Sequence, residues 1–257
     1  MKQLFFFKLQ SNGNDFILFN CDELGDLDFS LLSKKLCQRQ FSIGADGLII
    51  LDKIDDNSFE MKYFNNDGSE AEICGNALLS IGRYLYEKYS IQADVKIVTK
   101  AGERKILCGL TQKAFLAPIN SSYREIIIGG DKGYFTKAIG NPHAVFFGRL
   151  PPNDKLLSIM ERYACEACFL DGININFVHI IDQDNIEIKT WERGVGLTLS
   201  CVSGAASSFI IAHHLELIGD EITIHFENNS SKISIEDDMI VMHGKAELVY
   251  EGIINNQ

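Results

Sequence analysis

The feature that most constrains this chain is a stretch that occurs twice, over residues 65–77 and again over residues 192–205. Each copy follows a strand-like run, passes through a glycine-containing loop, reaches a cysteine and enters a helix of small and apolar residues. Cys74 lies nine residues after Asn65, Cys201 lies nine after Glu192, and the two cysteines are 127 residues apart in a chain of 257. This period predicts two similar halves, because the repeats of solenoid proteins are shorter, about 20–50 residues.

A cysteine at a helix start lies beside unpaired backbone amides and the positive end of the helix dipole. This environment lowers a thiol pKa from about 8.5 toward roughly 3.5–7.5, and the same amides can bind a carboxylate. If the two halves face each other, Cys74 and Cys201 could remove and return a proton on opposite faces of one carbon. The alternative is a pair of buried structural thiols, since cysteine is often buried; the matched spacing favours chemistry.

The composition excludes several classes of protein. A net charge of −11 and a pI near 5.0 argue against a nucleic-acid or anionic-membrane partner. No apolar run approaches the roughly 20 residues of a membrane span, and the first residues do not resemble a signal peptide. Seven scattered cysteines do not form a disulfide pattern, so we expect a reducing cytoplasm. Cys165 and Cys168 form a CxxC motif, but no second pair of cysteines or histidines follows at zinc spacing. We therefore expect no metal site there.

Periodicity predicts a mixed order of strands and helices. Helical spacing covers residues 31–37, 74–89, 156–165 and 201–212, and short strands fill most of the remainder. The helices after the two cysteines are apolar nearly all round, as is typical of buried helices. A domain boundary is expected near residues 111–122, and the C-terminal tail is predicted to be polar.

Three polar residues in turns are weaker candidates for function. Asn14 follows Gly13 in a tight turn and could present its amide to a ligand, although such residues are usually structural. Asn141 precedes Pro142, which keeps it out of the helical region. His143 could act as a base, but a hydrogen-bonded structural histidine is the favoured interpretation. No dinucleotide, phosphate-loop, zinc-protease or serine-hydrolase motif is present.

Seven motifs, in order along nearly the whole chain, resemble those of the diaminopimelate epimerase family, whose members are cofactor-independent amino-acid epimerases. They lie at residues 13–16, 43–47, 64–70, 74–76, 140–143, 174–177 and 191–196. The resemblance implies an α/β fold with two pseudo-symmetric domains, each a barrel-like mixed sheet around a central helix, with the active site in the cleft between them. The domains would be residues 1–117, joined by the C-terminal tail, and residues 118–257.

The resemblance also implies the chemistry and its residues. Cys74 and Cys201 would be the catalytic thiol pair, with no metal and no cofactor. The amides of Gly75, Asn76, Val202 and Ser203 would hold the reacting carboxylate. The remaining substrate contacts would come from Asn14, Asn65, Asn141, Asn174, Glu192 and Arg193. The substrate would be LL-2,6-diaminopimelate, converted to the meso form for lysine and peptidoglycan synthesis by a cytoplasmic homodimer.

Several positions depart from the family pattern, and they leave alternatives open. Leu197 stands where the family usually has glutamate, Val202 where it has glycine after the cysteine, and Leu79 where it has arginine. A racemase or isomerase of another amino acid, including the phenazine-biosynthesis type, is therefore an alternative. A non-catalytic amino-acid-binding protein is a third hypothesis, which the presence of both cysteines disfavours.

Overall fold

In the computed structural model, which describes residues 2–25, 27–164, 169, 172–193 and 195–256, the chain divides into two units. Unit 1 comprises Met1–Ala114 and Gly244–Gln257, and unit 2 comprises Phe115–His243. The chain leaves unit 1 within strand β8 (Gln112–Pro118) and returns within β17 (Met239–Gly244). The expected domain boundary after residue 117 falls inside β8.

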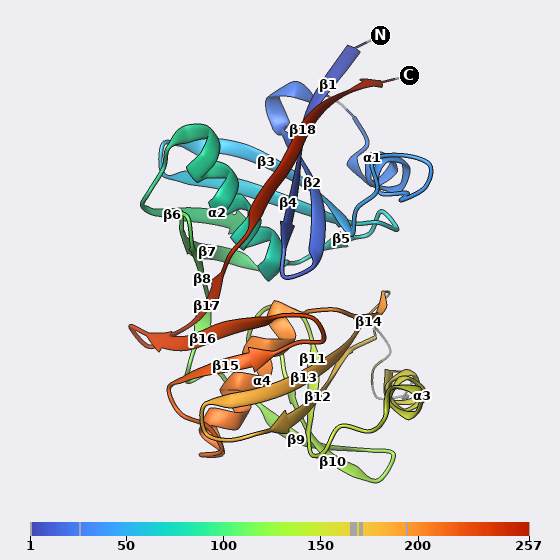
Figure 1. Ribbon diagram of the computed structural model, residues 1–257, viewed down its shortest axis with the longest axis vertical. Helices are drawn as coiled ribbons and strands as arrows, with labels where there is room; N and C mark the ends of the chain where they lie inside the picture. The colour runs from blue at the N-terminus through green and yellow to red at the C-terminus, as the bar shows by residue number, and fades with distance from the viewer. Residues whose placement is uncertain (1, 26, 165–168, 170–171, 194, 257) are drawn as a thin grey trace. The chain divides into compact units, whose positions relative to one another are not determined.

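The elements of unit 1 alternate strands with two helices (Figure 1). They are β1 (Lys2–Ser11), β2 (Asn14–Asn20), a 3-10 turn (Cys21–Glu23), α1 (Phe29–Leu36), β3 (Gly47–Asp55), β4 (Ser58–Asn65), β5 (Glu70–Ala71), α2 (Gly75–Tyr89), β6 (Asp94–Thr99), β7 (Gly102–Leu107) and, at the end of the chain, β18 (Glu247–Asn256).

The elements of unit 2 follow the same alternation. They are β9 (Arg124–Ile128), β10 (Asp131–Thr136), β11 (His143–Phe147), α3 (Asn153–Ala164), β12 (Asn174–Ile180), β13 (Asn185–Glu192), β14 (Gly196–Thr198), α4 (Val202–His214), β15 (Glu221–His225) and β16 (Ser230–Glu236), followed by β17.

Strand pairing shows that the two units share one topology. In unit 1 the order is β18-β1-β2-β3-β4-β6-β7, with β2–β3 and β4–β6 parallel and the other neighbours antiparallel. In unit 2 the order is β9-β10-β11-β12-β13-β15-β16, and the two parallel pairs occupy the equivalent places, β11–β12 and β13–β15. The short strands β5 and β14 pair antiparallel with β4 and β13. The prediction of a mixed α/β fold with two similar halves is confirmed.

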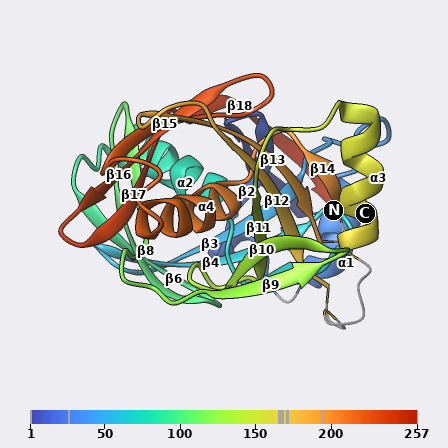
Figure 2. The ribbon, with the colours of Figure 1, turned by 90° about the horizontal axis from the view of Figure 1, so that it is seen from below.

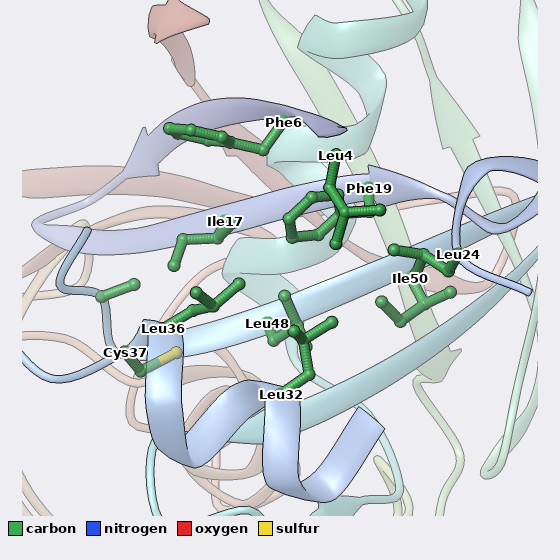
Figure 3. Packing of buried hydrophobic residues seen from close by; sticks show 11 residues of the cluster. Leu4, Phe6, Ile17, Phe19, Leu24, Leu32, Leu36, Cys37, Leu48 and Ile50 are labelled. Carbon is green, nitrogen blue, oxygen red and sulfur yellow. The ribbon is translucent and has the colours of Figure 1, made fainter. Parts of the chain in front are cut away.

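Successive side chains of a strand point to opposite faces of its sheet, and in both units a helix packs against each face. In unit 1, Ile17 and Phe19 of β2 and Leu48 and Ile50 of β3 pack with helix α1 in one hydrophobic cluster (Figure 3). The opposite face packs against α2, where the ring of Phe7 lies 4.8 Å from that of Tyr84. Unlike an amphipathic surface helix, α2 is therefore buried through most of its first three turns.

Unit 2 repeats this arrangement with α3 and α4, which Figure 2 shows from a second direction. Ala144 and Phe146 of β11 and Ile175 of β12 pack with helix α3. The alternate residues of these strands face α4, which is buried from Val202 through Ala212. Because α4 covers one face of β11 and β12, polar residues on that face can be held close to the start of the helix.

One segment differs from expectation. Residues 247–256, predicted only as a polar tail, form the ten-residue strand β18, which pairs antiparallel with β1 from Lys2↔Asn256 to Gln10↔Glu247. Val249 and Ile253 are exposed on this strand, so its apolar residues do not mark one buried face as clearly as in the central strands. No helix in the described part of the chain is long and apolar enough to cross a membrane.

Candidate active site

Cys74 follows the β4–β5 turn and is the last residue before α2. Its backbone is extended (φ −133°, ψ 114°), and its carbonyl accepts the amide of Leu78 at 3.1 Å to close the first helical turn. The amides at the start of a helix have no acceptor within the helix, and the dipole is positive there. The amides of Gly75 and Asn76 are therefore suited to binding an anion beside the thiol.

Cys201 occupies the equivalent position before α4. Its backbone is again extended (φ −135°, ψ 107°), and its carbonyl accepts the amide of Ala205 at 2.9 Å. The amide of Gly204 donates to its sulfur at 3.4 Å. The prediction that both cysteines lie at helix starts is confirmed, and Val202 and Ser203 carry the first helical amides in unit 2 as Gly75 and Asn76 do in unit 1.

The hydroxyl of Ser203 links Cys201 to a buried histidine. Ser203 Oγ lies 3.4 Å from Cys201 Sγ and 3.0 Å from His143 Nε2, and Asn141 Nδ2 donates to the same hydroxyl at 3.3 Å. His143 is fully buried on the face of β11 that packs against α4. Burial lowers the pKa of His143 to about 3, and the nearby charge of Arg193 acts in the same direction, so its imidazole is neutral near pH 7.

The hydrogen-bond partners of Asn176 determine which imidazole nitrogen carries the proton. The amide nitrogen of Asn176 lies 3.1 Å from the carbonyl oxygen of Ala144, and its amide oxygen accepts the hydroxyl of Thr190 at 3.0 Å. The same nitrogen lies 3.0 Å from His143 Nδ1, which must therefore be the acceptor. The proton of neutral His143 is on Nε2 and points toward Ser203 and Asn141. This leaves the Ser203 hydrogen available to Cys201.

The predicted substrate residues of unit 2 form two groups. Asn141 belongs to the His143–Ser203 group, and Asn174 borders it, with Nδ2 donating to the carbonyl oxygen of Pro142 at 3.0 Å. Asn174 Oδ1 accepts the backbone amide of Arg193 at 2.9 Å, which ties the end of β13 to β12. Glu192 Oε1 accepts the hydroxyl of Thr198 at 2.6 Å across the β13–β14 turn.

Asparagine side chains form a chain of hydrogen bonds at the start of α2 in unit 1. Asn12 Nδ2 donates to Asn76 Oδ1 at 3.0 Å, Asn76 Nδ2 donates to Asn14 Oδ1 at 2.6 Å, and Asn14 Nδ2 donates to Asp46 Oδ2 at 3.0 Å. Asn76 is nearly fully buried, whereas Asn14 is partly exposed. Asn14 and Asn76, both predicted substrate residues, are therefore in direct contact.

Asn65, a further predicted substrate residue of unit 1, lies at the end of β4. Its amide side chain donates to Ser69 Oγ at 3.0 Å, and its backbone amide donates to the Ser69 carbonyl at 2.9 Å. Gly68 makes this turn possible, with φ +83° and a backbone that closely approaches Ser30. Asn65 is thus held by its own turn.

Sequence reasoning missed the residues that support these side chains. Asp46 lies inside a recognised motif, but only the three-dimensional contact with Asn14 shows its role. The sequence does not indicate the roles of Asn176, Thr190 and Ser203 Oγ, because the contacts that join them to one another and to His143 span 14 to 60 residues in sequence. The strand pattern of residues 174–180 was the available signal, since it places Asn174 and Asn176 on the same face.

The three departures from the family pattern occupy different environments. Leu79 is fully buried in α2, and Val202 is 2% exposed in α4, so both side chains belong to helix packing. Leu197 is 36% exposed on β14, next to Thr198, the partner of Glu192. Only Leu197 therefore presents apolar surface beside a predicted substrate residue.

Cys21, Cys37 and Cys108 lie in environments that favour the protonated thiol. Burial raises the pKa of the Cys37 thiol, and it raises that of Cys108 to about 12, so both remain protonated. Burial and the charge of Asp52 likewise raise the pKa of Cys21. Cys165 and Cys168 lie outside the described residues. Within the described ranges, no group of three histidine, cysteine or acidic side chains is arranged to hold a metal ion.

Solved structures share this fold across the whole chain. The phenazine biosynthesis protein of Bacillus anthracis superposes with a TM-score of 0.74 at 14% identity, covering 100% of both chains. A hydroxyproline epimerase from Agrobacterium vitis superposes with a TM-score of 0.70 at 12% identity, covering 99% of this chain and 91% of that one. At such identities these similarities establish the two-domain fold and not the substrate.

Sequence comparison identifies the family. The family model described as diaminopimelate epimerase matches residues 6–114 and 135–249. A diaminopimelate epimerase of Alkaliphilus metalliredigens is 31% identical over 276 aligned positions, covering 98% of this chain and 97% of the relative. One from Rickettsia bellii is 33% identical over 265 positions, covering 96% of each chain. The chain therefore belongs to the diaminopimelate epimerase family and is an isomerase.

Proposed function

We propose that this enzyme interconverts LL- and meso-2,6-diaminopimelate without a cofactor, with Cys74 and Cys201 as its two acid/base groups. The observation that carries the proposal is the matched position of the two cysteines. Each is the residue before the buried helix of a topologically equivalent strand–turn–helix segment, in a chain that aligns end to end with diaminopimelate epimerases. The product would serve lysine and peptidoglycan precursor synthesis in the cytoplasm, and the protein would act as a homodimer.

In the proposed reaction one cysteine, as the thiolate, removes the α-proton and becomes a thiol. The electron pair of the broken C–H bond is delocalised into the α-carboxylate, which the first-turn amides of Gly75, Asn76, Val202 and Ser203 stabilise. The other cysteine, as the thiol, donates its proton to the opposite face of the carbon and becomes the thiolate. The carbon is inverted, no atom is gained or lost, and the pair returns to its starting state when the protons exchange with water.

The remaining predicted substrate residues suit the polar ends of such a molecule. Arg193 can pair with the distal carboxylate in a two-pronged geometry, and Glu192 can pair with the distal ammonium group. Asn14, Asn65, Asn141 and Asn174 supply amide donors and acceptors. The backbone hydrogen bond from Arg193 to Asn174 couples one of these amides to the arginine.

The first experiment is proton NMR of LL-diaminopimelate with reduced enzyme in deuterium oxide, using wild type, Cys74→Ala, Cys201→Ala and the control Cys21→Ala. We expect loss of the α-proton signal and appearance of the meso isomer with wild type and the control only. Retention of activity in either Cys74→Ala or Cys201→Ala would refute the two-thiol mechanism.

A second candidate, epimerisation of another amino acid by the same chemistry, rests on Leu197. An apolar side chain next to Thr198 and Glu192 changes the surface on which the distal group would bind. Absence of exchange with diaminopimelate by folded, reduced enzyme, together with exchange of a less polar amino acid, would favour this alternative.

A further inference from the structure

A cluster of charged side chains lies behind Asn14 in unit 1, and the proposed reaction does not use it. Arg39 donates to both carboxylate oxygens of Asp15, at 3.1 and 2.6 Å, and to Asp46 Oδ1 at 2.6 Å. Lys8, which is 7% exposed, donates to Asp15 Oδ2 at 2.6 Å and to the carbonyl oxygen of Gly44. Two carboxylates and two cations thus hold the 39–46 loop against the start of β2.

The local backbone is shaped around Arg39 and Asp46. Gly44 has φ +76°, and a Cβ atom there would lie 2.7 Å from the Arg39 Cα atom, so only glycine allows this approach. The Asp46 amide donates to the Asp15 carbonyl oxygen at 2.9 Å, and the Asp46 carbonyl oxygen accepts the amide of Asn66 at 3.2 Å. The position of the Asp46 carboxylate is therefore fixed by backbone contacts to β2 and to the turn after β4.

The carboxylate of Asp46 fixes the orientation of the neighbouring amides. An ionised carboxylate only accepts hydrogen bonds, whereas an asparagine side chain donates from one end and accepts at the other. The Asn14 nitrogen must therefore face Asp46, which turns the Asn14 oxygen toward Asn76. The Asn76 nitrogen must then face Asn14, which turns its oxygen toward Asn12. One negative charge thereby determines the direction of three consecutive side-chain amides.

We infer that Asp46, held by Arg39, is a positioning residue that orients the substrate-binding amides of Asn14 and Asn76 at the start of α2. The inference rests on the proposed function in taking Asn14 as a substrate contact. The contacts of the Asp46 carboxylate are with other side chains and the backbone of unit 1, so it acts on the substrate through Asn14. An amide at position 46 has nearly the same shape as the carboxylate, but it can also donate, and the chain of amides then loses its fixed direction.

The structural half of the inference can be tested without substrate. The side-chain amide groups of Asn12, Asn14 and Asn76 are observed by nitrogen–proton NMR and assigned with single Asn→Asp variants. We expect Asp46→Asn to shift all three resonances. The matched control Asp56→Asn removes an exposed carboxylate of the same unit that pairs with nearby Lys53, and it should shift none of them. Unchanged Asn14 and Asn76 resonances in Asp46→Asn would overturn the inference, whatever the substrate proves to be.

The functional half uses a double-mutant cycle of Asp46→Asn and Asn14→Ala with diaminopimelate. If Asp46 acts through Asn14, Asp46→Asn raises KM about tenfold with kcat changed less than threefold. This pattern is expected when the lost interaction stabilises the bound substrate and the transition state equally. The double variant should then match Asn14→Ala alone. If the fold-changes of the two single variants instead multiply in the double variant, Asp46 acts independently of Asn14, and the inference is wrong. A wild-type enzyme without α-proton exchange would instead refute the proposed function while leaving the NMR test valid.

Discussion

The hydroxyl of Ser203 should stabilise the Cys201 thiolate, and replacing it with alanine tests this directly. Because neutral His143 donates from Nε2 and Asn141 donates from Nδ2, both lone pairs of Ser203 Oγ are engaged, and its hydrogen is directed to Cys201 Sγ. A hydrogen bond to a charged acceptor is worth about 1.5–3 kcal/mol. Since about 1.4 kcal/mol corresponds to one pKa unit, Ser203→Ala should raise the Cys201 pKa by roughly one to two units. The backbone amide of residue 203, which would hold the carboxylate, is retained.

The assay is a pH titration of protein labelled with carbon-13 at cysteine Cβ. The Cys201 signal is identified by its loss in Cys201→Ala, so the measurement does not require reagent access to a sulfur whose residue is only 4% exposed. Ser207→Ala is the matched control, because Ser207 is a buried serine of the same helix whose hydroxyl has no hydrogen-bond partner in the described structure. Equal Cys201 midpoints in wild type and Ser203→Ala, or an equal shift in Ser207→Ala, would refute the reasoning.

Three further predictions concern stability, packing and redox state. Although burial opposes ionisation, hydrogen bonds from Arg39 and Lys8 lower the pKa of Asp15 in the folded state. The ionised carboxylate therefore stabilises the fold above its unfolded pKa near 3.8, and this stabilisation is lost as the pH falls through the folded pKa. Denaturant unfolding at a series of pH values should show a smaller loss of stability at acid pH in Arg39→Gln than in wild type, and an unchanged pH dependence would contradict this. A Cβ at Gly204 would lie 2.2 Å from Asn176 Oδ1, so Gly204→Ala should displace the Asn176–His143 pair and lower kcat/KM at least tenfold. A wild-type kcat/KM in this variant would show that the neighbouring side chains accommodate the methyl group without disturbing the active site. If both thiols act on one carbon, diamide should inactivate the enzyme by joining Cys74 to Cys201 and reductant should restore it, whereas full activity with both thiols still reduced after treatment would count against their facing each other.

The sequence predicted the cysteine environments because their signals are local. Each cysteine stands between a glycine-containing turn and a run of apolar helix residues, and both prove to be the residue before a buried helix. The order of strands and helices was accessible for the same reason, since period-2 and helical spacing are properties of short segments.

The supporting contacts were not accessible because they join residues distant in sequence. His143 was favoured as a structural histidine, and its burial and its hydrogen bond from Asn176 agree with that, yet its contact with Ser203 also connects it to Cys201. The direction of the Asn12–Asn76–Asn14 chain depends on Asp46, which lies 30 residues before Asn76. Strand β18 was missed because its pairing with β1 joins the two ends of the chain.

The most direct test of the two-thiol mechanism is the isotope content of product and recovered substrate after brief turnover in deuterium oxide. Two separate acid/base groups predict that meso-diaminopimelate carries deuterium at the inverted carbon, because its proton comes from a thiol equilibrated with solvent. Recovered LL-diaminopimelate should retain protium, because the thiol that removed the proton can only return it to the same face. Product that retains protium, or substrate and product labelled equally from the start, would show that a single group serves both faces and would contradict the paired roles of Cys74 and Cys201.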